Sequence, residues 1–416
     1  MNKLKVNIGI MGLGYVGLPL LLLLSKKYSV VGFDTDKKRV DQIRNGIDKN
    51  SEFSKKQILN KKFKVSNDPN EIKNCNLYIV AVPTPLKGYK PDLRNLESAN
   101  ATISKFLKKR DIVVYESTVY PGLTEEFCVA QLQKKSKLIP NKDFFYGYSP
   151  ERVNPGDKSK KIENIIKITS GSSKKTANTI DKIYKSVITA GTYPVSSIKI
   201  AEAAKVIENT QRDINIAFMN ELSIIFKKMK LNTKEILDAA GTKWNFIKFK
   251  PGLVGGHCIG VDPYYLSYKA KKIGINPKFI LSGRKINDNY YKFLINEIKF
   301  FFKFRKNKKN LRILILGASF KENCKDIRNS QIIKIYNNIK NKYKVEIFDP
   351  IINFNEIYQK HGIKLSKKIK TNYYDYVLIA VDHAIFKKKY KSQIEKSVKN
   401  SGKIKDLKFL FKNKYV

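Results

Sequence analysis

Cysteine and histidine are scarce in this 416-residue chain, and their scarcity excludes two kinds of site. The four cysteines, Cys75, Cys128, Cys258 and Cys324, are far apart and form no Cys-x-x-Cys pair, which argues against a zinc site and a disulfide framework. With three histidines in the whole chain, a histidine-based zinc site is not expected, although His257 beside Cys258 could act as a base or a ligand. We therefore expect reduced thiols and no bound metal.

Long hydrophobic runs are also missing. The apolar run from Leu18 to Leu24 is too short for a membrane span and comes too early for a signal region, because a strand pattern begins almost at Met1. We therefore expect a cytoplasmic protein. Its length suits two or three domains, each able to bury a sizeable core.

Acidic residues are few: 36 Asp and Glu face 82 Lys and Arg, for a net charge of +46. Such a charge invites a nucleic-acid or membrane-surface function. However, only ten of the basic residues are Arg, and the Lys residues are scattered, so stretches such as Lys303–Lys309 and Lys387–Lys391 are interpreted as solvated faces. We predict no nucleic-acid binding and no membrane insertion, and a surface that attracts anionic substrates.

The first 190 or so residues alternate between strand and helix patterns. Strands are expected at Val6–Met11, Tyr28–Phe33, Asn76–Val82, Asp111–Glu116 and Ile165–Thr169, separated by polar helical segments. This order predicts a parallel, doubly wound sheet.

The middle of the chain changes to helical spacing. Long helices are expected at Ser197–Leu231 and Ile286–Phe304, with a shorter one at Thr233–Ala240 and a Gly/Pro-rich loop from Lys250 to Pro263. A basic linker, Arg305–Asn310, then leads to a second α/β pattern with strands at Leu311–Leu316, Val345–Phe348, Tyr376–Val381 and Gly402–Leu407. We predict an α/β protein in which two Rossmann-like parallel-sheet domains, residues 1–196 and 306–416, are joined by a central helical domain, residues 197–305.

The strongest cofactor signal is Gly12-x-Gly14-x-x-Gly17, which follows a strand, opens a helix and has Asp34 at the end of the next strand. The glycines let the backbone approach a pyrophosphate at the helix N-terminus, and Asp34 can bind both ribose hydroxyls. An acid at this position repels a 2′-phosphate, so NAD is favoured over NADP. The alternative is that the glycines only permit tight turns.

Two further loops, Val82-Pro-Thr-Pro85 and Glu116-Ser-Thr-Val-Tyr-Pro-Gly122, stand where strands end, which is where ligands bind in open α/β sheets. Hydroxyls at Thr84, Ser117 and Thr118 can serve cofactor, substrate or water. Both loops can equally be ordinary proline-containing turns.

Lys205 and Asn209 are four residues apart on the long helix and point from one face, as a pair that stabilises an alkoxide would. Lys205 alone can also be a solvated surface residue.

Cys258, in Gly255-Gly-His-Cys-Ile-Gly-Val-Asp262, stands among glycines that leave room for a substrate, whereas a single cysteine is more often a small buried hydrophobe.

Taken together, these motifs resemble the UDP-glucose/GDP-mannose dehydrogenase family over essentially the whole chain. The resemblance also rests on Ser149-Pro-Glu-Arg-Val153, Glu202-Ala-Ala-Lys-Val-Ile-Glu-Asn209, Pro251-Gly-Leu-Val-Gly-Gly-His-Cys258 and the segment from Leu316 to Ser330. Within the family, the segments around Glu151 and Cys258 look most like the branch that oxidises UDP-N-acetylglucosamine or UDP-N-acetylgalactosamine for surface polysaccharides. The turn Val381-Asp-His-Ala and the position of Cys324 depart from the family pattern, and neither departure touches the catalytic set.

The resemblance implies two successive hydride transfers to NAD without release of the aldehyde. Cys258 would add to the aldehyde and carry a thiohemiacetal and then a thioester, which water hydrolyses. Lys205 and Asn209 match the oxyanion-stabilising pair of the family, and Asp262 and Thr118 match its water-holding pair. Glu151 matches the base of the thioester steps, with the duties of Glu151 and Asp262 open to exchange.

The resemblance also implies the binding residues. For the cofactor they are Gly12, Gly14, Tyr15, Val16, Gly17, Asp34, Arg39, Pro83, Thr84, Thr118 and Arg328. For the UDP-sugar they are Glu151, Arg152, Lys205, Asn209, Gly255, Arg284, Phe320 and Lys321. The length of the 197–231 helix and the place of Arg284 suggest a homodimer.

Alternative activities are UDP-glucose 6-dehydrogenase and UDP-N-acetylmannosamine dehydrogenase. A one-step hydroxyacid dehydrogenase shares the dinucleotide domain and the Lys/Asn pair but lacks the Cys258 loop and the C-terminal α/β domain. A non-catalytic polyanion-binding protein would be indifferent to replacement of Cys258.

Overall fold

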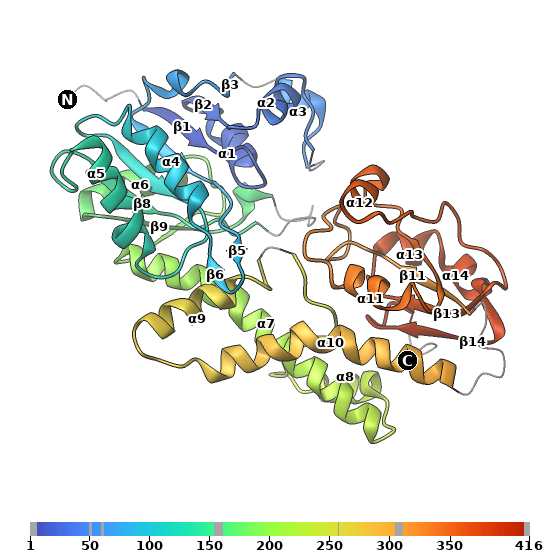
Figure 1. The fold of residues 1–416 in the computed structure, drawn as a ribbon. Coiled ribbons are helices and arrows are strands. Elements are labelled where there is room, and N and C mark those ends of the chain that lie inside the picture. Colours follow the sequence, from blue (N-terminus) through green and yellow to red (C-terminus); the bar gives the residue numbers. More distant parts are fainter. Residues whose placement is uncertain are drawn as a thin grey trace. The chain divides into compact units, whose positions relative to one another are not determined.

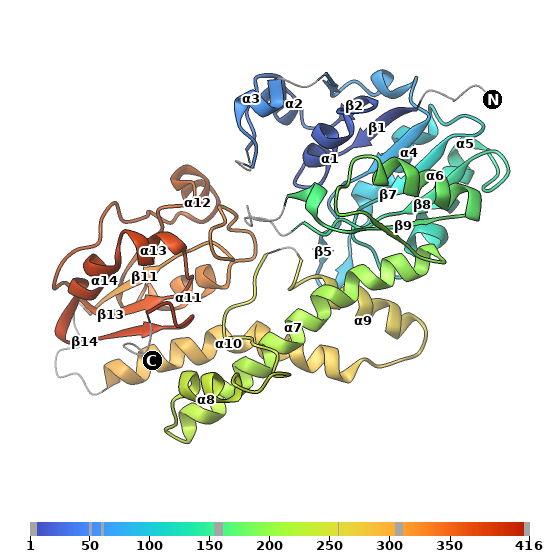
Figure 2. The same ribbon diagram turned by 180° about the vertical axis from the view of Figure 1, so that it is seen from behind.

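The computed structural model describes residues 6–49, 52–59, 62–153, 161–256, 258–303 and 311–411 (Figures 1 and 2). They form two compact units. The N-terminal unit is Met1–Glu208 with Tyr264–Asn276, and the C-terminal unit is Asn209–Pro263 with Pro277–Val416. The predicted basic linker at 305–310 and the predicted boundary after residue 305 lie outside the described residues, and the division into three domains stays a prediction.

The N-terminal unit is built on an eight-stranded sheet of order β10-β9-β8-β7-β4-β1-β2-β3. The strands are β1 Asn7–Met11, β2 Ser29–Phe33, β3 Lys64–Ser66, β4 Leu77–Val80, β7 Ile112–Tyr115, β8 Phe145–Tyr148, β9 Lys167–Gly171 and β10 Thr192–Pro194. All five predicted strands are present, and β4 through β3 follow the doubly wound order expected from the alternating pattern.

The sheet differs from the prediction in the direction of one strand pair and in three additional strands. The strands pair in parallel except β8 and β9, which run antiparallel with Gly147 opposite Gly171, so the expected wholly parallel sheet was wrong at this edge. Strands β3, β8 and β10 were also not predicted. Each is only three or four residues long, too short to show a hydrophobic period.

Helices cover both faces of this sheet, with α4 nearer the viewer in Figure 1 and α6 in Figure 2. Side-chain caps fix two of the helix starts: Asp36 accepts the backbone N–H of Lys38, and Ser173 accepts that of Thr176. The elements are α1 Gly17–Leu24, α2 Lys37–Arg44, α3 Lys55–Leu59, η1 Pro69–Ile72, the hairpin β5 Leu86–Lys87 and β6 Lys90–Pro91, α4 Arg94–Ser104, the π-helical η2 Thr124–Val129, α5 Ala130–Ser136, η3 Ile162–Asn164 and α6 Lys174–Lys185.

The central helices are α7 Ile198–Lys228, α8 Thr233–Ala240, α9 Asp262–Lys272 and α10 Lys278–Lys303. Helices α7 and α8 agree with the prediction, and Asn232 caps α8 by accepting the backbone N–H groups of Lys234 and Glu235. Helix α10 begins eight residues before the predicted start at Ile286. Helix α9 was not predicted, and its first two residues, Asp262 and Pro263, fall in the predicted Gly/Pro-rich loop. Proline is tolerated in the first turn of a helix, where its missing N–H costs nothing.

The second sheet has the order β12-β11-β13-β14 and is parallel throughout. Its strands are β11 Arg312–Leu316, β12 Lys344–Phe348, β13 Tyr374–Ile379 and β14 Val398–Asp406, with helices α11 Gln331–Ile339, α12 Phe354–His361, α13 Ala384–Lys388 and α14 Lys391–Ser397. The order repeats that of β2-β1-β4-β7 in the first sheet, as the sequence suggested.

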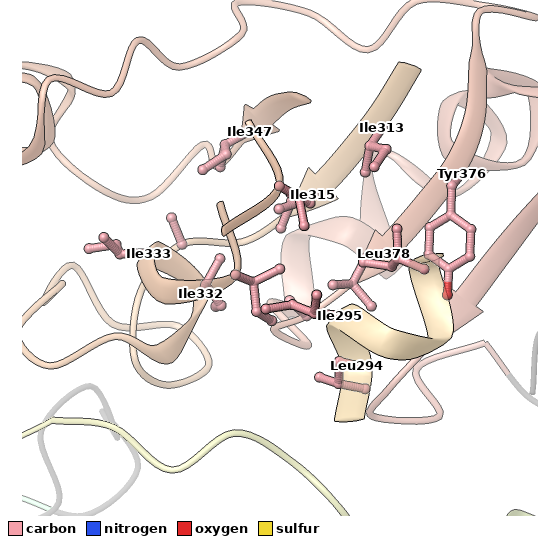
Figure 3. Close-up of a cluster of buried hydrophobic side chains, with 14 of the residues drawn as sticks. Leu294, Ile295, Ile313, Ile315, Ile332, Ile333, Ile347, Tyr376 and Leu378 are labelled. Atoms are coloured by element: carbon pink, nitrogen blue, oxygen red, sulfur yellow. The ribbon is translucent and has the colours of Figure 1, made fainter. Parts of the chain in front are cut away.

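The core of the C-terminal unit includes a central helix. Figure 3 shows Leu294 and Ile295 of α10 beside Ile315 of β11 and Leu378 of β13, all of them buried. Burial of such side chains stabilises the fold by about 1.5–3 kcal/mol each, so the packing of α10 against this sheet contributes to the stability of the C-terminal unit. No described helix has both the length and the apolar composition needed to cross a membrane.

Candidate active site

The turn between β1 and α1 has the geometry of a dinucleotide site. Gly12 lies in the left-handed region, with φ of 91°, and a Cβ on Gly17 would meet the Gly12 carbonyl oxygen at 1.8 Å, so side chains are excluded at both positions. A Cβ on Gly14 would meet nothing within 4 Å, and this residue is exposed. The turn therefore leaves its backbone open to a pyrophosphate at the N-terminus of α1, flanked by the half-buried Tyr15 and Val16.

The carboxylate of Asp34 stands beside this turn. Its Oδ2 accepts the N–H of Leu13 at 2.8 Å and its Oδ1 accepts the N–H of Asp36 at 2.9 Å, which holds the side chain half-exposed at the end of β2. The turn and this acid fit NAD. Arg39 is buried and donates to the carbonyl of Leu13 at 2.9 Å, so it supports the turn from inside the protein.

The two proline-containing loops pack on each other. Thr84 Oγ1 donates to the carbonyl of Thr118 at 2.7 Å, and Ser117 Oγ donates to the carbonyl of Val82 at 2.7 Å. Ser117 is buried, so its hydroxyl is structural, whereas Thr84 and Thr118 stay half-buried and Pro83 is exposed. Tyr265 of α9 fixes the first loop by donating to the carbonyl of Thr84 at 2.6 Å.

Glu151 and Lys205, both candidate catalytic residues, lie side by side in the N-terminal unit. Their charged atoms lie 4.0 Å apart, and both side chains are largely buried. Arg152 pairs with Glu208 at 2.7 Å and donates to the carbonyl of Ile166 at 3.0 Å. The arrangement places an ammonium and a carboxylate side by side. Such a pair can donate a proton to, or accept one from, an alcohol or aldehyde oxygen.

Two buried groups of this unit were not assigned a role from the sequence. Glu202 is fully buried on α7 and accepts the N–H groups of Gly122 at 2.5 Å and Thr124 at 2.9 Å, which fixes the end of the Thr118 loop. Burial raises the pKa of Glu202 to about 7, against the opposing effect of these hydrogen bonds.

Lys167 of β9 forms a buried ion pair with Glu116, which also accepts a hydrogen bond from the hydroxyl of Tyr184. The ammonium also donates to the carbonyls of Pro150 at 3.0 Å and Ser149 at 3.3 Å, directly before Glu151. The sequence showed only that Glu116 is an acid within a motif. It did not identify Lys167 as its partner, because the two residues are more than fifty residues apart in the chain.

In the C-terminal unit, Cys258 lies in a loop that runs into α9. Its carbonyl accepts the N–H groups of Val261 and Asp262, both at 2.9 Å. The side chain of Asn209 donates to Asp262 Oδ2 at 2.6 Å, and Asp262 is buried. Cys258 is half-buried, whereas Cys75, Cys128 and Cys324 are buried. A partly exposed thiol, a carboxylate and an amide are thereby joined through one loop, and His257 lies outside the described residues.

The loop after β11 packs on the glycines before Cys258. The backbone N–H of Gly256 donates to the carbonyl of Arg328 at 3.1 Å, and a Cβ on Gly256 would meet the Phe320 ring at 2.6 Å. A Cβ on Gly255 would meet the Asn329 carbonyl oxygen at 2.7 Å, so no larger residue fits there. Lys321 is half-buried beside Phe320, and the Arg328 side chain binds Asp326 at 2.5 Å while 42% exposed.

Arg284, predicted to bind substrate, is 2% exposed. Its guanidinium pairs with Asp213 at 2.5 Å and with Asp288. No group of three or more Cys, His, Asp or Glu side chains within the described ranges could hold a metal ion.

Three family models match successive parts of the chain. They are described as the UDP-glucose/GDP-mannose dehydrogenase family NAD binding domain, central domain and UDP binding domain, and they match residues 6–188, 199–289 and 314–413.

The chain is also similar to individual proteins over nearly its whole length. A UDP-N-acetyl-D-glucosamine 6-dehydrogenase of Salmonella typhi is 49% identical, over 98% of this chain and 96% of the relative. A protein of the same name from Pseudomonas aeruginosa is 47% identical, over 99% and 98%. Among solved structures, the UDP-D-ManNAc dehydrogenase of Pyrococcus horikoshii is similar with a TM-score of 0.88 and 30% identity, over 99% of this chain and 97% of that one.

Proposed function

The chain belongs to the UDP-glucose/GDP-mannose dehydrogenase family, and on this premise we propose that it oxidises the C6 hydroxymethyl of a UDP-N-acetylhexosamine to a carboxylate. It is an NAD-dependent nucleotide-sugar dehydrogenase with a UDP-sugar as substrate. Two relatives almost half identical to it are named UDP-N-acetyl-D-glucosamine 6-dehydrogenases, which supports UDP-N-acetylglucosamine as the substrate. The product would be a uronic-acid donor for a surface polysaccharide.

The catalytic part of the proposal rests mainly on the hydrogen bonds that connect Cys258, Asp262 and Asn209. The backbone carbonyl of Cys258 accepts the N–H of Asp262, and the Asp262 carboxylate accepts a hydrogen bond from the amide of Asn209. The thiol and the carboxylate are therefore four residues apart on one hydrogen-bonded turn. A one-step alcohol oxidation needs neither group. A thiol and a water-activating carboxylate are what oxidation from aldehyde to acid requires.

The residues divide the reaction between them. Lys205 and Asn209 stabilise the alkoxide of the substrate during the first oxidation. Glu151 is the base of the thioester steps. The Cys258 sulfur then bonds to the aldehyde carbon, and loss of the second hydride leaves a thioester on Cys258. Asp262 with Thr118 holds the water that breaks the carbon–sulfur bond, returning the thiolate and releasing the carboxylate. Bound NAD supplies the hydride acceptor, so that one alcohol, two NAD⁺ and one water give one carboxylate, two NADH and three protons.

The remaining assignments follow the resemblance to the family. Gly12, Gly14, Gly17 and Asp34 would hold NAD, with Tyr15, Val16, Arg39, Pro83, Thr84, Thr118 and Arg328 completing or supporting its site. The UDP-sugar would be held by Arg152, Gly255, Phe320 and Lys321, while Arg284 would act on the substrate directly or by way of its buried partners. The free cysteines suit a reducing compartment, which supports a cytoplasmic location.

The test is NADH formation from UDP-N-acetylglucosamine, UDP-N-acetylgalactosamine, UDP-N-acetylmannosamine and UDP-glucose offered separately, with Cys258→Ser alongside. We expect two NADH for each UDP-N-acetylglucosamine, and a stall after the first NADH in the variant. Turnover of UDP-glucose alone would overturn the substrate, and two NADH per sugar from the variant would overturn the thioester.

We also propose that two copies of the chain associate along α7. Ile200, Ile207, Phe218 and Ile225 are 45–53% exposed on this helix. They are seven, eleven and seven residues apart, which is close to whole turns, so they form one apolar stripe. Sedimentation should give a dimer that Phe218→Glu dissociates, and a monomer at working concentration would refute the proposal.

A further inference from the structure

The loop that carries Cys258, here called the Cys258 loop (residues 250–261), is hydrogen-bonded at Gly252 by the side chain of Asn220. The Oδ1 of Asn220 on α7 accepts the N–H of Gly252 at 2.7 Å, and its Nδ2 donates to the carbonyl of Gly252 at 3.0 Å. Asn220 is fully buried. Its amide thus pairs with both backbone groups of one residue, as a neighbouring strand would, which only a side chain with a donor and an acceptor can do.

The orientation of this amide is dictated by charge. Arg284 pairs with Asp213, and the Asp213 carboxylate can only accept, so the Nδ2 of Asn287 must point to it, at 2.7 Å. The Oδ1 of Asn287 is then left to accept from Nδ2 of Asn220 at 2.8 Å. The side-chain amides of Asn287 and Asn220 therefore each have one permitted orientation. In that orientation the oxygen of Asn220 faces the N–H of Gly252.

The segment after β11 binds the Cys258 loop at Gly256. Nδ2 of Asn329 donates to the carbonyl of Gly256 at 2.9 Å, and the N–H of Gly256 donates to the carbonyl of Arg328 at 3.1 Å. Asn329 has a φ of 53°, so its backbone is held in the left-handed region. Beyond Cys258, a Cβ on Gly260 would lie 3.8 Å from Arg284 Nη2. The loop is therefore held at two points before its cysteine, Gly252 and Gly256, by groups that all belong to the C-terminal unit.

We propose that Asn220 and Asn329 are positioning residues, which hold the Cys258 loop so that the thiol meets the aldehyde carbon. The inference rests on the proposed function. The thiol has no part in the first hydride transfer but must be placed within a fraction of an ångström for the second, since displacement of a reacting group by about 1 Å can cost about a hundredfold in rate. Loss of either amide should therefore slow the second oxidation selectively.

The first test uses Asn329→Gly, because glycine keeps the left-handed backbone and removes only the side chain. The matched control is Asn372→Gly. Asn372 is also exposed and also has a positive φ, of 46°, and its backbone N–H bonds the Lys396 carbonyl. With enzyme in excess over UDP-N-acetylglucosamine, we expect Asn329→Gly to release the first NADH within about twofold of the wild-type rate and the second at least about tenfold more slowly. The control should match the wild type in both phases. Equal slowing of both phases, or none, would overturn the proposal.

The second test does not depend on turnover. Cys258 is the half-buried cysteine and the other three are buried, so iodoacetamide labels the native protein at Cys258. We expect Asn329→Gly and Asn220→Ala to change the labelling rate at least about threefold, because the surroundings of a thiol set its reactivity. Thermal unfolding identifies an Asn220→Ala protein that has not folded, and Asn329→Gly then carries the test. An unchanged rate in a folded Asn329→Gly would overturn the proposal, whereas two NADH from Cys258→Ser would overturn the proposed function and leave the labelling result standing.

Discussion

The Nδ2 of Asn209 donates a hydrogen bond to Oδ2 of Asp262 at 2.6 Å, which joins the middle of α7 to the first residue of α9. Asp262 is 2% exposed and its backbone N–H donates to the carbonyl of Cys258, so both its backbone and its side chain are hydrogen-bonded. Under the proposed function, this carboxylate would orient water against the thioester on Cys258.

Asp262→Asn should trap the thioester. The amide that replaces the carboxylate cannot take a proton from water, so we expect kcat to fall by about 10²–10⁴. Intact-mass spectrometry of the enzyme mixed with NAD and substrate should then show a covalent adduct on Cys258. The control is Asp238→Asn, at an exposed position of α8. An unchanged kcat would remove Asp262 from the mechanism.

Asp34→Asn should weaken NAD binding and leave the turn intact. The amide oxygen can still accept the N–H of Leu13, whereas the N–H of Asp36 loses its acceptor. A charged hydrogen bond to the ribose is also lost, which is typically worth 1.5–3 kcal/mol, or about 10–150-fold in KM for NAD. The preference for NAD over NADP should shrink as well, because the acid no longer repels a 2′-phosphate. Asp36→Asn is the control, since asparagine caps a helix as well as aspartate does. Steady-state kinetics with NAD and NADP measure both effects, and an unaltered KM for NAD would contradict the assignment.

Glu202 should make stability depend on pH near neutrality. Burial raises its pKa from 4.5 to about 7, so between these pH values the folded protein binds more protons than the unfolded chain. The stability contributed by the protonated carboxyl is fully present below pH 4.5 and is lost as the pH rises through 7, by an amount on the order of 3 kcal/mol. Unfolding midpoints at pH 5 and 8 should therefore differ more for the wild type than for Glu202→Gln. Parallel pH profiles for the two proteins would show that Glu202 does not titrate there.

Lys167→Met should destabilise the N-terminal unit by about 3–5 kcal/mol, because it leaves the carboxylate of Glu116 buried without its charge partner. Adding Glu116→Gln should recover part of the loss, since the uncompensated charge is then gone. Urea unfolding of the two single variants and the double variant forms the cycle that measures this coupling. Strictly additive losses would mean that the pair contributes nothing beyond its separate side chains.

Much of the fold could be predicted from the sequence. The central strands of both sheets are apolar runs that end in a glycine turn or an acid, and β1, β2, β11 and β12 lie where these signals put them. The antiparallel pairing of β8 with β9 could not be predicted, because direction depends on how the chain returns to the sheet and not on the composition of short strands. Helix α9 was not predicted, because its first two residues continue the Gly/Pro-rich stretch that precedes them.

For the site, the sequence by itself determined what is local: the glycine turn with its acid, the cysteine among glycines, and Lys205 four residues before Asn209 on one helix. In each case the chemistry depends on residues linked by a single turn, loop or helix, whose geometry follows from spacing alone. The tertiary structure alone decided which polar side chains support them. Glu202 and Asn220 look like ordinary polar residues of a helix until folding buries them against the backbones of Gly122 and Gly252, because a buried polar group is stable only with a partner that the chain brings from far away.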